Sequence, residues 1–169
     1  MLRLDLDFNR SYKKMIKILF VCHGNICRSP MAEFMMKDMV KYRQLDDKIY
    51  VDSAALSTEE IGNCIHKGTR EKLEAVGVSY DENKKARMMT SRDYEEFDYI
   101  IGMDELNMRE LRQLFNGDPD GKTYKLMEFT DNDKDIPDPW YTHDFDDTYD
   151  DLLVGLSGLL KCLKEAHDL

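Results

Sequence analysis

The segment VCHGNICRSP, residues 21–30, places a thiol, a guanidinium and a hydroxyl within a few positions of one another. It overlaps a run of β-branched and aromatic residues, 17–22, which is typical of a short buried strand. Ser29 and Pro30 then favour a helix, with the serine as its N-cap and the proline at its first position. The sequence therefore predicts a loop between a strand and a helix N-terminus, with Cys22 at its base.

Such a loop can bind an oxyanion. Its backbone N–H groups can converge on one point, and the helix dipole adds a partial positive charge. Gly24 and Asn25 tolerate the left-handed conformations of a tight loop. The helix end and the Arg28 cation favour the thiolate of Cys22, and a guanidinium can hold two phosphate oxygens at once. This spacing suits attack by Cys22 on a phosphoryl group, with Ser29 donating a hydrogen bond to the sulfur.

Strands and helices are expected to alternate along the rest of the chain. Strands are expected over 49–52, 99–103 and 124–127, and helices over 67–75, 91–97, 105–115 and 147–166, with Asp104 as an N-cap. This order is typical of a three-layer α/β/α fold, in which helices cover both faces of a parallel sheet. Ligands of such sheets bind beyond the carboxyl ends of the strands, where Cys22 is expected. Cys162 lies on the leucine-rich stripe of the last helix and is expected in the core.

Composition limits the classes of partner. The 169 residues include 24 Lys and Arg against 34 Asp and Glu, a net charge of −10, which disfavours binding to nucleic acid. No apolar run is long enough to span a membrane. Residues 1–14 lack the apolar core of a signal peptide and are expected to form an extension, followed by a single domain over 15–169. Four scattered cysteines, without an export signal, favour the reducing cytoplasm.

The chain resembles the low-molecular-weight protein tyrosine phosphatase family. The resemblance runs in order through C-x5-R-S-P (22–30), MAE (31–33), VDSAA (51–55), IGN (61–63), AR (86–87), FDYIIGMD (97–104) and DPWY (138–141). It implies a flavodoxin-like fold with a four-stranded parallel sheet and a phosphate loop after the first strand. It also implies hydrolysis of phosphotyrosine through a phosphocysteine, with no metal and no cofactor.

The resemblance also implies roles for single residues. Cys22 resembles the nucleophile, Arg28 the phosphate clamp and Ser29 the partner of the thiolate. The remaining residues of the implied phosphate loop are His23, Gly24, Asn25, Ile26 and Cys27. Asn25 and Ser53 resemble a pair that stabilises this loop. Cys27 resembles a second cysteine that forms a disulfide with the nucleophile under oxidation.

Asp138 matches the general acid of the family. A phenolate leaves poorly unless it is protonated, so such an acid is expected to accelerate the reaction by ~10²–10⁴-fold. Asp135 and Asp144 are the alternatives in the same acidic loop. After Pro139, Trp140 and Tyr141 either anchor the loop on the sheet or form an apolar wall for an aromatic ring, and at least one of them is expected to form this wall.

Glu59 departs from the family pattern. The family usually has Trp or Tyr at this position, two residues before the IGN turn. A glutamate cannot stack on a phenyl ring, and its charge repels acidic peptides. The sequence therefore predicts weak binding of phosphotyrosine peptides and a milder defect for small aryl phosphates. The alternative is that Glu59 points to solvent and Trp140 or Tyr141 alone holds the ring. The substrates expected are phosphotyrosine proteins or small aryl phosphates, with inorganic phosphate as product.

Other activities fit the residues less well. A thiol-dependent arsenate reductase shares this loop but needs two further cysteines close together, whereas Cys64 and Cys162 are far apart in sequence. A phosphocysteine carrier or phosphate-binding module does not need Arg28 and Asp138 together. The acidic run 131–142 lacks the glycine and the final glutamate of a calcium loop. His23 is expected either to tune Cys22, to line the mouth of the cleft, or to do neither.

Overall fold

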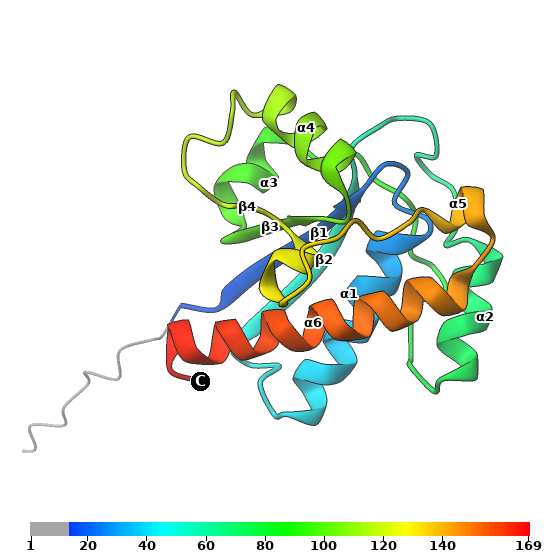
Figure 1. The fold of residues 1–169 in the computed structure, drawn as a ribbon, viewed down its shortest axis with the longest axis horizontal. Helices are drawn as coiled ribbons and strands as arrows, with labels where there is room; N and C mark the ends of the chain where they lie inside the picture. The colour runs from blue at the N-terminus through cyan, green and yellow to red at the C-terminus, as the bar shows by residue number, and fades with distance from the viewer. Residues whose placement is uncertain (1–13) are drawn as a thin grey trace, which may run out of the picture.

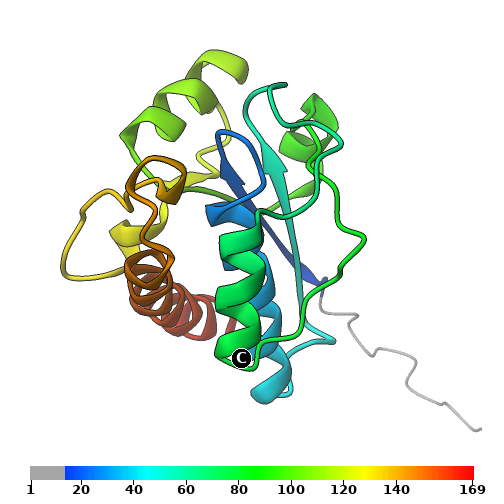
Figure 2. The same cartoon turned by 90° about the vertical axis from the view of Figure 1, so that its right-hand side faces the viewer.

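The computed structural model describes residues 14–169 and contains one four-stranded parallel sheet with helices on both faces (Figures 1 and 2). The expected extension over residues 1–14 therefore lies, apart from Lys14, outside the described residues. The strands are β1 (Ile16–Cys22), β2 (Ile49–Ala55), β3 (Tyr99–Gly102) and β4 (Thr123–Lys125), in the order β2-β1-β3-β4. The predicted α/β fold with a four-stranded parallel sheet is confirmed.

Helices form a layer on each face of the sheet. The helices are α1 (Arg28–Tyr42), α2 (Lys67–Ala75), α3 (Ser91–Glu96), α4 (Glu105–Leu114), the short α5 (Pro139–Thr142) and α6 (Phe145–His167), with a 3-10 helix η1 (Leu126–Phe129). In Figure 1, α1 and α6 lie below the sheet, and α3 and α4 lie above it. Within residues 14–169, no helix has the length and apolarity needed to cross a membrane.

Alternating side chains of β1 supply both cores. Ile18 and Phe20 pack into the core between the sheet and helices α1 and α6. Leu19 and Val21 pack into the core between the sheet and helices α3 and α4. All four side chains are fully buried, as expected of a central strand covered on both faces. The parallel register pairs Cys22 with Ala55, so β1 and β2 end together at the edge of the sheet where the predicted loop begins.

Several element boundaries differ from the predictions. β2 continues to Ala55 because its last residues still pair with β1. β4 ends at Lys125, and the chain turns into η1 instead of continuing as a strand to residue 127. Helix α1 begins at Arg28 with Cys27 at the N-cap position, so Ser29 is not the cap and its hydroxyl is available to the loop. Cys162 is exposed, contrary to prediction, because it lies at the edge of the leucine stripe of α6.

Two glycines allow α6 to pack closely on η1. A Cβ at Gly155 would lie 2.6 Å from Leu126 Cγ, and one at Gly158 would overlap the carbonyl oxygen of Phe129. Glycine inside a helix normally costs stability relative to alanine. Here the close contact with η1 explains why the helix carries glycine at both positions.

Gly158→Ala is therefore expected to destabilise the protein, although alanine is the better helix former. Because the obstacle is backbone, the helix must shift, which typically costs about 1–3 kcal/mol. Urea unfolding followed by circular dichroism measures the change. Ser157→Ala, at an exposed neighbouring position, is the control and is expected to stay within about 0.5 kcal/mol of the parent. A Gly158→Ala protein as stable as the parent would contradict this account of the packing.

Candidate active site

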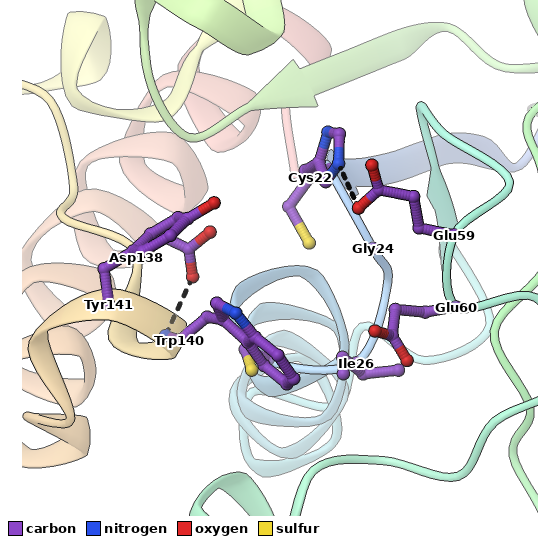
Figure 3. A pocket seen from close by; sticks show the side chains of 10 residues that line it. Cys22, Gly24, Ile26, Glu59, Glu60, Asp138, Trp140 and Tyr141 are labelled. Atoms are coloured by element: carbon purple, nitrogen blue, oxygen red, sulfur yellow. Dashed lines mark hydrogen bonds and ion pairs between the residues drawn. The ribbon is translucent and has the colours of Figure 1, made fainter.

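A pocket opens where β1 ends, and it collects most of the residues singled out in the sequence. Cys22 lies between two walls in Figure 3, with Asp138, Trp140 and Tyr141 on one side and Glu59 and Glu60 on the other. The full lining is Cys22, His23, Gly24, Ile26, Cys27, Glu59, Glu60, Asp138, Trp140 and Tyr141. The first wall comes from the segment at α5, and the second comes from the loop that follows β2.

The thiol of Cys22 lies within hydrogen-bonding distance of Ser29. Its Sγ is 3.0 Å from Ser29 Oγ and 3.5 Å from the Ser29 backbone nitrogen, in the first turn of α1. The Ser29 hydroxyl already accepts a hydrogen bond from Asn25 Nδ2, at 2.9 Å. Its own proton is therefore free to point at the sulfur. The first turn of a helix also favours negative charge, so this position suits an anionic sulfur.

The side chain of Asn25 stabilises the loop between Cys22 and Ser29 through hydrogen bonds. Asn25 adopts the left-handed conformation with φ 58°, as predicted, whereas Gly24 does not. Its amide also donates to Ser53 Oγ, at 2.9 Å, and its carbonyl accepts from the Arg87 backbone nitrogen, at 3.3 Å. Ser53 in turn donates to Glu33 Oε2, at 2.6 Å. The predicted pair of Asn25 and Ser53 is thus in contact.

Glu33 is a buried carboxylate beneath the loop that sequence reasoning did not select. It is 2% exposed and pairs with Lys84 Nζ at 2.8 Å and Lys37 Nζ at 2.6 Å. Lys84 also contacts Asp52 Oδ1, at 2.9 Å. Burial alone raises the pKa of Asp52, but the hydrogen bond and charge of Lys84 outweigh it and lower that pKa below its ordinary value. This set of ion pairs links α1 and β2 to the chain before α3.

Arg28 is almost completely buried and only partly satisfied. Its Nη1 donates to Asp104 Oδ2, at 2.6 Å, and to the carbonyl oxygen of Ile136, at 2.9 Å. Its Nε is buried without a hydrogen-bond partner. An unpaired buried donor on a cation is costly unless an anion meets it. The guanidinium is therefore fixed through Nη1, and its Nε is available to an anion, whereas Nη2 lies 3.4 Å from Asp138 Oδ2.

Asp104 serves the site as well as the helix. Its Oδ1 accepts from the Asn107 backbone nitrogen, at 2.8 Å, which makes it the predicted N-cap of α4. Its other oxygen accepts from Arg28. Burial opposes the charge on Arg28, but Cys22 and Asp104 raise the pKa of the guanidinium above its ordinary value. The capping signal located Asp104, but nothing in the sequence indicated its contact with Arg28.

Asp138 is the acidic residue of its loop that lines the pocket. It caps α5 by accepting from the Trp140 backbone nitrogen, at 3.0 Å, and its other oxygen lies 3.4 Å from Arg28 Nη2. Asp135 instead pairs with Lys125 Nζ, at 3.2 Å, and Asp144 caps α6. Neither of these alternatives lines the pocket.

The acidic run that resembled a calcium loop contacts a lysine. Lys125 is 4% exposed, and its Nζ lies 2.9 Å from Asp133, 3.2 Å from Asp135 and 3.3 Å from Glu105. Burial lowers the pKa of Lys125, but these carboxylates raise it well above its ordinary value. The run is therefore anchored to β4 by an internal cation.

The two cysteines of the loop differ in environment. Burial is the main cause that raises the pKa of the Cys27 thiol far above its ordinary value, with the nearby Cys22 adding to it. Cys27 is therefore a neutral thiol at physiological pH and a poor nucleophile. Both cysteines are reduced in this structure. The disulfide implied by the resemblance stays a prediction.

The walls differ in chemistry. Trp140 is 49% exposed and packs edge-on against His66, with ring centroids 5.8 Å apart, and Tyr141 is 77% exposed. On the opposite side, Glu59 Oε2 lies 2.9 Å from His23 Nε2. The Glu59 side chain is thus paired with His23 while it remains 69% exposed to solvent. His23 lines the mouth of the cleft, one of the possibilities that the sequence left open.

Comparison with known proteins agrees with this geometry. Residues 17–168 match the family described as "Low molecular weight phosphotyrosine protein phosphatase". The chain is 38% identical to the low molecular weight protein-tyrosine-phosphatase YfkJ of Bacillus subtilis, over 92% of this chain and 100% of the relative. It is 35% identical to PtpA of Staphylococcus aureus, over 86% of this chain and 92% of the relative.

Solved structures give the same result. The crystal structure of YfkJ from Bacillus subtilis superposes with a TM-score of 0.87 and 39% identity, covering 90% of this chain and 97% of that one. The low molecular weight protein tyrosine phosphatase SP-PTP from Streptococcus pyogenes superposes with a TM-score of 0.80 and 42% identity, covering 88% and 93% of the two chains. The chain belongs to the low molecular weight phosphotyrosine protein phosphatase family.

Proposed function

We propose that this protein-tyrosine phosphatase acts through a phosphocysteine at Cys22, with Arg28 as phosphate clamp and Asp138 as general acid. The observation that carries the proposal is the pocket in which Cys22 and Asp138 face one space and Arg28 keeps a buried, unpartnered Nε. Its substrates are phosphotyrosine in proteins and small aryl phosphate esters, and its product is inorganic phosphate. A cytoplasmic location, away from nucleic acid and membranes, suits a reaction that needs a reduced thiol.

The first step transfers the phosphoryl group. The sulfur of Cys22 attacks phosphorus while Arg28 Nε and the loop amides hold the non-bridging oxygens. The bond from phosphorus to the aryl oxygen breaks, and Asp138 gives its proton to the departing phenolate. The products are the free phenol, a phosphocysteine and the Asp138 carboxylate.

The second step returns the enzyme to its starting state. A water molecule attacks the phosphocysteine and passes a proton to the Asp138 carboxylate. The bond from sulfur to phosphorus breaks, and the thiolate of Cys22 leaves as inorganic phosphate forms. The proton of Ser29 Oγ, directed at the sulfur, stabilises the negative charge that develops there.

The alternative activities fit the geometry less well. A disulfide relay needs further cysteines near the nucleophile, but Cys64 contacts Lys85 and Cys162 is exposed on α6. Neither lines the pocket. A carrier needs its phosphocysteine protected from water, whereas Asp138 faces the sulfur across an open pocket and can activate water.

Cys22→Ser tests the nucleophile. The serine variant is expected to bind vanadate or inorganic phosphate but to lose nearly all turnover of p-nitrophenyl phosphate, because a hydroxyl is a far weaker nucleophile than a thiolate. Steady-state kinetics and a vanadate titration measure both properties. Cys64→Ser, which changes an exposed thiol outside the pocket, is expected to retain activity. Substantial turnover by Cys22→Ser would assign the nucleophile elsewhere.

Asp138→Asn tests the general acid. Esters of poorly leaving phenols are expected to lose ~10²–10⁴-fold in kcat/KM, and esters of well-leaving phenols less, since these need little protonation. A series of aryl phosphates with graded leaving groups measures this dependence. Asp135→Asn is the matched control, because it changes an aspartate of the same loop outside the pocket. An unchanged leaving-group dependence in Asp138→Asn would rule out this role.

Asp104→Asn tests how the clamp is held. Asparagine is an equally good N-cap, so α4 is expected to keep its N-terminus, but the thermal midpoint is expected to fall because the buried Arg28 loses its charged partner. Hydrogen bonds to such a charged partner contribute ~1.5–3 kcal/mol, or roughly 10- to 100-fold in kcat/KM and in affinity for phosphate. Inhibition by phosphate and the thermal midpoint are measured together. Unweakened phosphate inhibition would show that Ile136 alone is enough to hold the guanidinium.

A further inference from the structure

A histidine of the phosphate loop bridges two carboxylates at the mouth of the pocket. His23 Nε2 lies 2.9 Å from Glu59 Oε2, and His23 Nδ1 lies 3.5 Å from Glu110 Oε1. Glu59 comes from the loop after β2 and is 69% exposed, whereas Glu110 comes from α4 and is 23% exposed. One imidazole therefore connects three separate segments around the entrance.

This arrangement fits a protonated imidazole. Carboxylates only accept hydrogen bonds, and only the charged ring carries an N–H on both nitrogens. His23 Nδ1 and Glu110 Oε2 are both buried without a hydrogen-bond partner. In the neutral ring, one nitrogen lone pair would face a carboxylate, which is repulsive. The geometry therefore favours a positive charge on His23 between the two glutamates.

The electrostatic environment of His23 also favours its protonated form. Burial lowers the pKa of His23, but the hydrogen bond and charge of Glu59, together with Glu110, raise it above the ordinary 6.5. Glu59 and Glu110 are the charged groups with the largest effect on the ring. The proton is therefore held below the raised pKa and lost as pH rises through it. Its loss removes one positive charge, so the net charge of the mouth becomes more negative by one.

The mouth is where residues beside a phosphotyrosine must pass. Glu59 and Glu60 form the wall opposite Trp140 and Tyr141 (Figure 3). A cationic side chain next to the phosphotyrosine would be attracted by this wall, and an acidic one would be repelled. Because the wall is open to solvent, the effect is modest and weakens with salt.

We propose that His23 determines peptide specificity by setting the charge of this wall. The enzyme prefers phosphotyrosine peptides with a basic neighbour over those with an acidic neighbour, and the preference grows when His23 loses its proton. This inference rests on the proposed function, because it concerns substrates of the same pocket. It also refines the expectation for Glu59, whose charge is offset by His23 only while the imidazole is protonated.

Two phosphotyrosine peptides that differ only in Arg or Glu beside the phosphotyrosine provide the test. Both flanking charges stay constant between roughly pH 5.5 and 8.5. The ratio of the two kcat/KM values cancels the titrations common to both reactions, including that of the phosphate. At low ionic strength the ratio is expected to rise roughly two- to five-fold as pH increases through the His23 transition, and less at high salt.

Variants separate this role from a structural one. His23→Gln cannot titrate, so its ratio is expected to be independent of pH. Glu110→Gln removes a carboxylate that stabilises the imidazolium, so the transition is expected at lower pH. Glu165→Gln makes the same change of charge at an exposed position near the far end of α6, and is expected to leave the ratio and its pH dependence unchanged.

A ratio that does not change with pH in the parent enzyme would overturn the proposal, as would an equal rise in His23→Gln. If His23→Gln does not fold, an unmoved transition in Glu110→Gln overturns it instead. Turnover of p-nitrophenyl phosphate by the parent distinguishes a failure of the proposed function from a failure of the proposed role of His23. Without that turnover the proposed function fails, whereas turnover with a pH-independent peptide ratio rejects only the role of His23.

Discussion

The site depends on one buried cation. Arg28 is 2% exposed, and a charge removed from water to that extent must be compensated inside the protein. Asp104 and the Ile136 carbonyl provide this on one edge, and they lie 76 and 108 positions from Arg28 in the sequence. Asp138 lies 3.4 Å from Nη2, but the hydrogen bonding of the guanidinium is incomplete because Nε has no partner. A guanidinium held in this way needs no rearrangement when an anion arrives, which is the preorganisation that electrostatic catalysis requires.

The same principle extends beneath the loop. Asn25 is in a left-handed conformation that costs energy for any residue other than glycine, so the surrounding contacts must stabilise it. Its side chain contacts both Ser29 and Ser53, and Ser53 ends on the buried Glu33. Every hydroxyl in this chain of hydrogen bonds is oriented by its neighbour. The hydroxyl proton of Ser29 that points at Cys22 is therefore oriented, through Asn25 and Ser53, by the Glu33 carboxylate.

Local sequence signals predicted the parts of the molecule, and long-range contacts explain what they missed. The alternation of strands and helices along the chain, the cap at Asp104 and the loop from Cys22 to Ser29 follow from short patterns of residue type. The contact of Arg28 with Asp104 joins residues 76 positions apart, and no periodicity reports such a pairing. The prediction that Cys162 lies in the core was wrong. It lies at the margin of the leucine stripe of α6, where the sequence pattern does not distinguish a buried residue from an exposed one.

Net charge and local charge act at different distances in this enzyme. The chain carries −10, so its long-range field opposes the approach of a phosphate dianion. At contact distance, hydrogen bonds from charged donors contribute ~1.5–3 kcal/mol each, against ~0–1 kcal/mol for a solvent-exposed pair. The buried Arg28 and the end of α1 therefore outweigh the acidic exterior once the phosphate has entered. The exterior instead acts on the groups beside the phosphate. The acidic residues at the pocket mouth are therefore where the proposed discrimination between peptides would arise.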